Sequence, residues 1–317
     1  MRAVLIESFG DAPHVGELEV PALADDQVLI RVHAASVNAF DWKAAEGRFK
    51  EMFEYVFPVT IGRDYAGVVE QVGAAVGRVA PGDAVFGYFT GQRLALGAFA
   101  EQIWVDETDC FVAKPSGLSF VDAACLPLCG MVAYRCVDAV EPAPEETHLV
   151  LGAPGGVGSY AVQLLAARGA HVIASGLPED EAYLRDLGAA EVIDYRENLD
   201  AEVRARHPDG VRGLVDLVSY QPDFMRHVEL LVDGGRAASL HRSADPELLE
   251  PRGIVGTNVG SFPDPELLAR IGSDAAAGRL RVPLQRTFAL DEAPQALDLL
   301  KNEHARGKIA IAVRESD

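Results

Sequence analysis

The sequence predicts an α/β protein in which a parallel-sheet domain is inserted into a β-rich domain formed by both chain ends. Three observations support this prediction. Short strand candidates separated by Gly, Pro and Asp fill the chain to about residue 116, strands and helices alternate from about residue 147, and strand-like patterns return after about residue 278. The 317 residues suffice for two domains with separate cores. We expect domain segments at 1–118, 119–256 and 257–317.

The first part of the chain reads as an all-β domain. Its strand candidates lie at residues 28–34, 66–72, 84–87 and 100–105. Between them, Pro81-Gly82-Asp83 predicts a turn, because proline presets φ and glycine tolerates the positive φ that follows. Many short strands joined by such turns indicate a small barrel.

The middle part predicts a parallel sheet with helices on both faces. A strand at 149–151 runs into a glycine cluster, after which Val157, Ala161, Leu164 and Leu165 share one face of a helix that Gly169 ends. Pro178 begins the next helix and Gly188 closes it. Further strands are expected at 171–175, 192–195, 214–218 and 237–240, and the tail adds a strand at 287–290, a helix at 293–300 and a strand at 308–313.

Charge and cysteine content exclude several classes of function. A formal net charge of −20 repels nucleic acid and anionic membranes, so we expect neither as a partner. The charge-free run 147–167 is long enough to raise the question of a membrane span, but its glycines and Pro154 favour a strand, turn and helix. Cys110, Cys125, Cys129 and Cys136 form no CxxC pair, so we expect buried thiols, no metal site and a cytoplasmic protein without a targeting segment.

The most specific motif is Ala153-Pro154-Gly155-Gly156-Val157-Gly158, which has the spacing of G-x-G-x-x-G with alanine in the first place. It follows a predicted strand and opens a predicted helix, which is the context that a dinucleotide-binding turn requires. Gly155 lets the backbone approach a pyrophosphate, and Gly158 lets helix and strand pack closely. Gly156 and Val157 begin the helix, whose free N–H groups bind phosphate.

The end of the second strand of this domain suggests which dinucleotide is bound. An NAD site usually has Asp or Glu there, about 20 residues after the turn. The chain instead reads Ala174-Ser175-Gly176, and no carboxylate is present to repel a 2′-phosphate. We therefore expect NADPH (NADP) with Ser175, Tyr195 and Arg196 as phosphate partners, while the nearby Glu179 and Asp180 leave NAD open.

Several motifs taken together resemble one enzyme family. They are Ser36-Val37-Asn38-Ala39-Phe40-Asp41-Trp42-Lys43, Ile61-Gly62-Arg63-Asp64-Tyr65-Ala66-Gly67-Val68-Val69, Pro81-Gly82-Asp83-Ala84-Val85-Phe86-Gly87, Gly97-Ala98-Phe99-Ala100-Glu101, Leu126-Pro127 with Ala133-Tyr134, and Ala305-Arg306-Gly307-Lys308-Ile309. In this order they resemble the quinone oxidoreductase and enone reductase branch of the medium-chain dehydrogenase/reductase superfamily. The resemblance implies a GroES-like barrel from both chain ends, an inserted Rossmann domain, an active site in the cleft and a homodimer.

The departures from the family pattern bear on metal use. Zinc-dependent relatives place a Cys near Asn38, a His-Glu pair at Arg63-Asp64 and a four-cysteine lobe after about Gly87, and none of these is present. We therefore expect zinc-independent hydride transfer. Pro154 replaces the usual Ala, and Val132 replaces a Thr that often touches the cofactor.

The resemblance also suggests which residues perform the chemistry. Lys43 occupies the place of a lysine in the enone reductases and would stabilise an enolate or supply a proton, the alternative being a solvated surface lysine. Asn38 would orient nicotinamide or substrate, the alternative being a turn-stabilising asparagine. Asp41 and Asp64 are expected to be structural and Tyr65 to be a core residue. Val218 and Leu240 would contact the cofactor at strand ends.

The expected function is NADPH-dependent reduction of a small molecule, either a quinone or the C=C bond of an enone or enal. Three alternatives stay open at this point. They are an alcohol or carbonyl dehydrogenase using NAD(P)H, a non-catalytic NADPH-binding protein of the same fold, and an enoyl reductase of polyketide type.

Overall fold

The computed structural model describes residues 1–19, 21–91 and 93–314, and within it the chain forms two compact units. The first comprises Met1–Leu128 with Phe262–Asp317, and the second comprises Cys129–Ser261. Each unit is defined by the contacts among its own residues. The domain borders expected at 118/119 and 256/257 stay predictions.

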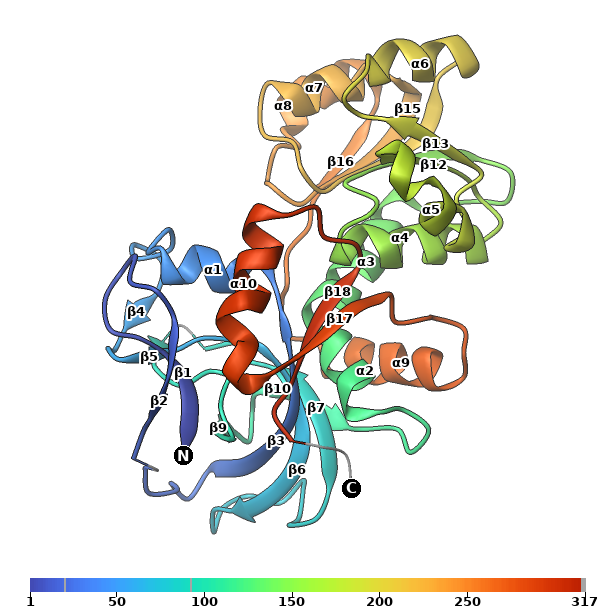
Figure 1. The fold of residues 1–317 in the computed structure, drawn as a ribbon. Helices are drawn as coiled ribbons and strands as arrows, with labels where there is room; N and C mark the ends of the chain where they lie inside the picture. The colour runs from blue at the N-terminus through green and yellow to red at the C-terminus, as the bar shows by residue number, and fades with distance from the viewer. Residues whose placement is uncertain (20, 92, 315–317) are drawn as a thin grey trace. The chain divides into compact units, whose positions relative to one another are not determined.

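The main sheet of the first unit combines strands from both ends of the chain (Figure 1). Its order is β10-β7-β6-β3-β18-β17, and β9 also pairs with β3. β18 runs antiparallel to β3, with Ile309 opposite Val37. The predicted GroES-like unit built from both ends is thereby confirmed. The bounds are β3 Gln27–Val37, β6 Asp64–Val72, β7 Ala84–Tyr88, β9 Gln102–Asp106, β10 Cys110–Ala113, β17 Leu284–Ala289 and β18 Lys308–Ala312.

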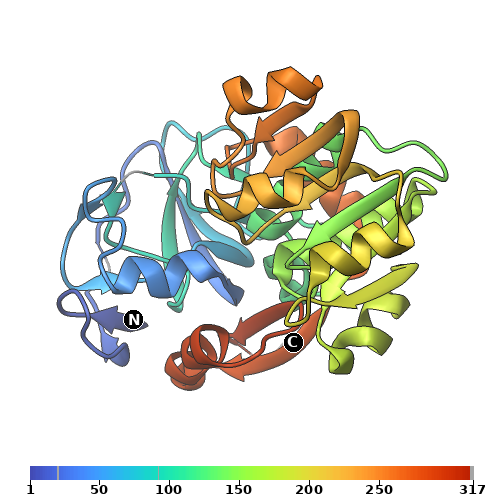
Figure 2. The same cartoon turned by 90° about the horizontal axis from the view of Figure 1, so that it is seen from above.

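Smaller elements complete the first unit around a core of Val, Ile and Phe side chains. One sheet joins β1 (Arg2–Ile6), β2 (His14–Glu17) and β5 (Val59–Thr60), and β4 (Glu54–Tyr55) pairs with β8 (Arg93–Leu94). Figure 2 shows helix α10 beside the strands β17 and β18 that flank it in sequence. The helices are α1 Ala39–Ala45, α2 Phe120–Cys125, α9 Pro265–Ala276, α10 Ala293–Asn302 and the one-turn η3 Leu290–Glu292, while α3 Pro127–Val140 passes into the second unit.

The second unit contains a six-stranded sheet in which every neighbouring pair is parallel. Its order, β13-β12-β11-β14-β15-β16, is that of a Rossmann domain and confirms the prediction. The strands are β11 Thr147–Leu151, β12 His171–Gly176, β13 Glu191–Asp194, β14 Val211–Asp216, β15 Leu231–Ser239 and β16 Val255–Asn258. The helices are α4 Gly156–Ala167, α5 Glu181–Asp186, α6 Leu199–Arg206, α7 Asp223–Val228 and α8 Pro246–Leu249, with one-turn η1 Pro178–Asp180 and η2 Glu250–Arg252.

Three predicted strands of the second unit end earlier than the sequence pattern suggested, and the correction has a physical reason. β14 ends at Asp216 because its carboxylate accepts hydrogen bonds from the N–H groups of Val218 and Ser219, which turn the chain. β15 ends at Ser239 and β13 at Asp194, so that Leu240 and Tyr195 also lie just beyond their strands. Apolar residues continue past the strands because they line the carboxyl edge of the sheet.

The predictions about cysteines and membrane spans have different outcomes. All four cysteines are buried thiols, as expected. No helix within the described residues combines the length and the apolar character that crossing a membrane needs.

Candidate functional site

The glycine turn lies at the carboxyl end of β11 and leads directly into α4. Gly152 adopts a φ of 77°, which is a left-handed conformation that favours glycine. Gly155 is the N-cap of α4 and offers no side chain to cap the helix. Because the first N–H groups of a helix lack partners within the helix, those of Gly156, Val157 and Gly158 are the donors that an anion would use.

The glycines of the turn serve two different purposes. A Cβ on Gly158 would lie 2.2 Å from the carbonyl oxygen of Gly152 and 2.6 Å from Cα of Ala153, so only glycine lets α4 pack against the turn. A Cβ on Gly155 would meet nothing of the chain closer than the Gly152 oxygen at 3.4 Å. The chain itself therefore does not require glycine at position 155, and this position leaves room for the close approach of a ligand.

Side chains that the sequence did not reveal fasten this turn. Ser159 Oγ donates to the backbone oxygens of Pro154 (3.0 Å) and Gly155 (2.7 Å), and lies 2.8 Å from the hydroxyl of Tyr183. The predicted phosphate partner Ser175 is buried, and its hydroxyl accepts the N–H of Gly152 at 3.1 Å. Ser175 thus holds the turn against the end of β12. The available signal for these contacts was a single serine within a largely apolar segment, Ser159 in α4 and Ser175 in β12.

Val218 and Leu240 are brought to the same edge of the sheet by Asp216. The Asp216 carboxylate holds the N–H of Val218, and the Asp216 backbone oxygen accepts the N–H of Leu240. Burial alone would raise the pKa of Asp216, but hydrogen bonds from His227, Ser219 and Val218 outweigh it and lower the pKa. Val218 is 54% exposed and so close to the turn that a Cβ on Gly152 would lie 2.8 Å from its Cγ1.

The remaining predicted cofactor residues, Tyr195 and Arg196, follow β13 at the sheet edge, two strands from the glycine turn. Both are exposed. Arg196 forms an ion pair with Asp194 at 2.9 Å. Asp180 is buried and accepts the N–H of Leu177 at 2.8 Å. This carboxylate therefore turns toward the backbone of its own segment.

In the first unit, the predicted residue Asn38 belongs to a buried polar cluster with Asp64 and Lys308. Asn38 Nδ2 donates to Asp64 Oδ2 at 2.9 Å, and Lys308 Nζ donates to Asn38 Oδ1 at 2.7 Å. Lys308 is 1% exposed and its ammonium lies 3.8 Å from Asp64 Oδ2. Ser36 and the N–H of Leu128 also donate to Asp64. The cluster fixes the amide of Asn38, and it joins residues that a sequence pattern does not connect.

Asp41 has the structural role expected of it. Its Oδ2 accepts the N–H of Asn38 at 2.7 Å, which closes the N-terminus of α1. Burial raises the pKa of Asp41 to about 7, although the hydrogen bond from Asn38 opposes this shift. Tyr65 is fully buried in the core, as predicted.

Lys43 lies on α1 and is half-buried. Burial, followed by the nearby charge of Arg48, lowers the pKa of its ammonium group. Its Nζ stands 5.5 Å from the centre of the Trp42 ring, and among the described residues no carboxylate forms an ion pair with it. A lysine with these properties donates a proton more readily than a solvated one.

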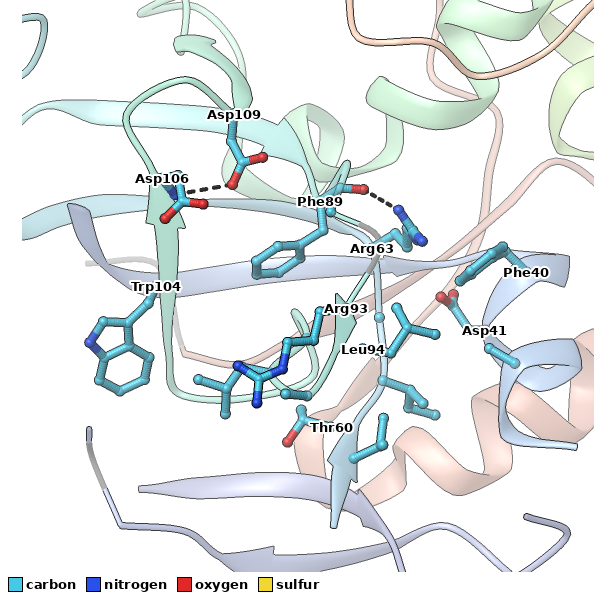
Figure 3. A pocket seen from close by; sticks show the side chains of 18 of the residues that line it. Phe40, Asp41, Thr60, Arg63, Phe89, Arg93, Leu94, Trp104, Asp106 and Asp109 are labelled. Carbon is cyan, nitrogen blue, oxygen red and sulfur yellow. Dashed lines mark hydrogen bonds between the residues drawn. The ribbon is translucent and has the colours of Figure 1, made fainter. Parts of the chain in front are cut away.

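A hollow of about 460 Å³ opens next to α1, within the first unit (Figure 3). Phe40, Asp41 and Ala44 of α1 line one side, and Arg63 and Phe89 line another. The Arg63 guanidinium donates to the Phe89 backbone oxygen and stacks over the ring of Phe40, 4.2 Å from its centre. Lys43 does not line this hollow; it follows Phe40 by one helical turn. Its lining combines aromatic rings with both arginine and aspartate side chains, so it offers a flat surface together with polar groups of either charge.

Comparisons with known proteins agree with both units. Residues 24–116 match the family described as alcohol dehydrogenase GroES-like domain, and residues 187–311 match the family described as zinc-binding dehydrogenase. The chain is 30% identical to the NADPH-dependent alkenal/one oxidoreductase, chloroplastic, of Arabidopsis thaliana, over 98% of this chain and 79% of that protein.

Two further matches carry the name quinone oxidoreductase. The chain is 33% identical to the chloroplastic quinone-oxidoreductase homolog of Spinacia oleracea, over 62% of this chain and 61% of that protein. The solved structure of the quinone oxidoreductase from Coxiella burnetii superposes with a TM-score of 0.88 at 28% identity, covering 99% of each chain.

Proposed function

Because this chain belongs to the quinone oxidoreductase and enone reductase branch of the medium-chain dehydrogenase/reductase superfamily, we propose that it is a zinc-independent NADPH oxidoreductase. Its substrate is a quinone or the C=C bond of an α,β-unsaturated carbonyl compound. The observation that carries this proposal is the glycine turn before α4. It leaves the helix N-terminus uncapped and leaves room at Gly155 for a ligand.

The residues of the second unit fit a dinucleotide. The pyrophosphate would take the N–H groups of Gly156, Val157 and Gly158, and Val218 and Leu240 would contact the remainder of the cofactor. Bound NADPH supplies a hydride from the C4 carbon of its nicotinamide ring. NADPH is proposed over NADH because Asp180 is occupied with the backbone of Leu177, and because the exposed Arg196 would exchange its ion pair with Asp194 for the 2′-phosphate. The Arabidopsis relative is named for NADPH as well.

The residues around Asn38 do not fit a zinc ion, although one matching family is described as zinc-binding. Zinc sites are built from thiolate, imidazole and carboxylate ligands. Here an amide, an ammonium and one carboxylate meet instead, and Lys308 already supplies the positive charge beside Asp64. Within the described part of the first unit, no three His, Cys, Asp or Glu ligand atoms come together. The proposed reaction therefore includes no metal.

Lys43 and Asn38 are the proposed catalytic residues. When a hydride reaches the electron-poor carbon of an enone or quinone, negative charge develops on the carbonyl oxygen, and a donor close to it lowers the barrier. Lys43 is proposed to stabilise this oxygen and to provide the proton that completes the reduction. Its lowered pKa supports this role, as does the fact that no carboxylate among the described residues forms an ion pair with it. Asn38, whose amide is fixed by Asp64 and Lys308, is proposed to orient the ligand.

The experiment that tests the proposal follows NADPH oxidation with a panel of quinones, enones, enals, aldehydes and ketones, with and without a chelator. We expect turnover with quinones or conjugated carbonyls, unaffected by the chelator. Lys43→Ala should lower kcat by about 10²–10⁴-fold while NADPH still binds, since general acid catalysis has this magnitude. Lys50→Ala, which removes an exposed lysine, is the matched control.

Other results would contradict the proposal. NADPH binding without turnover across the panel would favour a non-catalytic protein of this fold. Turnover restricted to simple aldehydes and abolished by the chelator would favour a zinc-dependent alcohol dehydrogenase.

We also propose a cytoplasmic homodimer. Four buried cysteine thiols suit a reducing compartment. β16 is an edge strand of the parallel sheet, and Val255 on it is exposed, so a second copy would find unpaired backbone groups there. Native mass spectrometry of the wild type and of Val255→Pro tests this arrangement. An unchanged dimer in the variant would contradict it.

A further inference from the structure

Two histidines and a glutamate converge in the second unit, at the end of its sheet opposite the glycine turn. His171 is the first residue of β12, Glu191 is the first residue of β13, and His207 follows the last residue of α6. All strands of this sheet are parallel, and the glycine turn follows the carboxyl end of β11. The three side chains therefore lie at the amino edge, away from the residues proposed to hold the cofactor.

The three side chains direct their ligand atoms at one point. The Nε2 atoms of His171 and His207 lie 2.7 Å and 2.9 Å from the same carboxylate oxygen, Oε1 of Glu191. The two imidazole rings are tilted by 56°, with centres 5.8 Å apart. All three ligand atoms lie within 4.8 Å of one another. Among the described residues, this is the one group of three such side chains that meets this distance.

The surroundings leave this point accessible and negatively charged. The side chains of His171, Glu191 and His207 are 39%, 20% and 18% exposed, and together they line a hollow of about 420 Å³. Glu145 stands on the wall of the same hollow. The nearest cation, Arg206, lies 3.4 Å from the other oxygen of Glu191, Oε2, so Oε1 is left to the two histidines.

We propose that His171, Glu191 and His207 form a binding site for one divalent transition-metal ion, for which zinc serves as the test ion. Zinc binds imidazole nitrogen and carboxylate oxygen at about 2.0–2.2 Å, so that two ligands of a tetrahedral ion stand about 3.4 Å apart. The two observed distances from the histidine nitrogens to Glu191 Oε1, 2.7 Å and 2.9 Å, are shorter than this. The exposed ring of His171 and the Glu191 carboxylate need to withdraw by only a fraction of an ångström, and water completes the coordination.

The ligand types select the class of ion. Two imidazoles with one carboxylate favour zinc, nickel, copper or cobalt, whereas magnesium and calcium prefer oxygen ligands alone. A bound ion would tie together the beginnings of β12 and β13 and the end of α6. Its effect would therefore appear in the stability of the second unit. The site is independent of the zinc-free hydride transfer proposed above, because it lies at the opposite edge of the sheet from the cofactor residues.

The test measures zinc binding to the full-length protein after chelator treatment, by isothermal titration calorimetry with zinc alone and with magnesium alone. Wild type should bind one zinc ion per chain and no magnesium, and zinc should raise its unfolding temperature. His171→Gln, His207→Gln and Glu191→Gln should each weaken binding by on the order of tenfold or more. Cobalt added in place of zinc reports the ligand geometry through its visible absorption.

His14→Gln is the matched control, because His14 is an exposed histidine 3.6 Å from Glu7 that lacks a third ligand. This variant should bind zinc like the wild type. Glu191→Gln keeps the shape of the side chain and guards against a variant that merely fails to fold, which circular dichroism checks. No binding by the wild type would overturn the proposal. Equal binding by wild type and the folded ligand variants would also overturn it, because it would place the ion on other groups such as the cysteines.

Discussion

The buried carboxyl group of Asp41 makes the stability of the first unit depend on pH, and Asp41→Asn removes this dependence. Burial raises the pKa of Asp41 from 3.8 to about 7. Between these values the unfolded chain has lost the proton and the folded chain keeps it. The contribution of Asp41 to the free energy of unfolding is therefore complete below pH 3.8 and is lost as the pH rises toward 7.

The magnitude follows from the two pKa values. Each pH unit between them is worth about 1.4 kcal/mol, so the whole difference amounts to about 4 kcal/mol as an upper bound. The isoelectric point of about 4.7 makes measurements near that pH impractical, because the protein would precipitate. From about pH 5.5 to pH 8 roughly 2 kcal/mol of the effect remains. The amide introduced by Asp41→Asn cannot ionise, so the free energy of unfolding of the variant, minus that of wild type, should rise by this amount.

Tryptophan fluorescence during urea unfolding measures this difference. Both tryptophans of the chain, Trp42 and Trp104, belong to the first unit, so the signal reports that unit specifically. Comparing the slopes of unfolding free energy against pH removes any constant loss of stability that the amide causes. Asp209→Asn, which changes an exposed aspartate, should give a curve parallel to that of wild type. Parallel curves for Asp41→Asn as well would refute the reasoning, because they would mean that the buried carboxyl group titrates normally.

Three further predictions concern the cofactor turn and the buried cluster. Gly158→Ala places a Cβ 2.2 Å from a backbone oxygen and should lower both stability and NADPH affinity, whereas Gly155→Ala should lower the affinity alone. Calorimetry with NADPH and thermal unfolding distinguish the two variants. Equal losses of affinity in both variants, without destabilisation of Gly158→Ala, would contradict the packing argument. Lys308→Met leaves Asp64 buried without its cation and should lower the free energy of unfolding by about 3–5 kcal/mol, which urea unfolding measures. A loss below about 1 kcal/mol would show that Asp64 is protonated. Arg196→Ala should weaken NADPH binding by on the order of tenfold and leave NADH binding unchanged, and equal losses for the two cofactors would remove Arg196 from the proposed 2′-phosphate site.

The pattern of apolar residues predicted most of the secondary structure, because this pattern is set by local chemistry. The strand, glycine turn and helix at residues 149–165 could be located because their periodicity changes at the glycines. Strand ends were less predictable. Leu217 and Val218 are as apolar as the strand before them, and only the hydrogen bonds to Asp216 show that the strand has ended.

The candidate site likewise combines a residue that the sequence singled out with residues that only the fold brings to it. The sequence singled out Asn38, but Lys308, which holds its amide, stands 270 positions away and joins it only because β18 pairs with β3. Lysine within the apolar strand Lys308–Ala312 was the one available signal. Likewise, Ser159 fastens the glycine turn and contacts Tyr183 of another helix, and the one signal of this in the sequence was a serine within a largely apolar helix.

The sequence by itself determined the family, the two kinds of domain and the location of the dinucleotide turn, since each depends on residues close together in the chain. Only the tertiary structure decided which polar side chains share a buried space. His171, Glu191 and His207 belong to three different segments, and their convergence follows from the order of parallel strands in the sheet. Hydrogen bonds and metal ligation require atoms within a few ångströms of one another, and that proximity arises only when distant segments pack together.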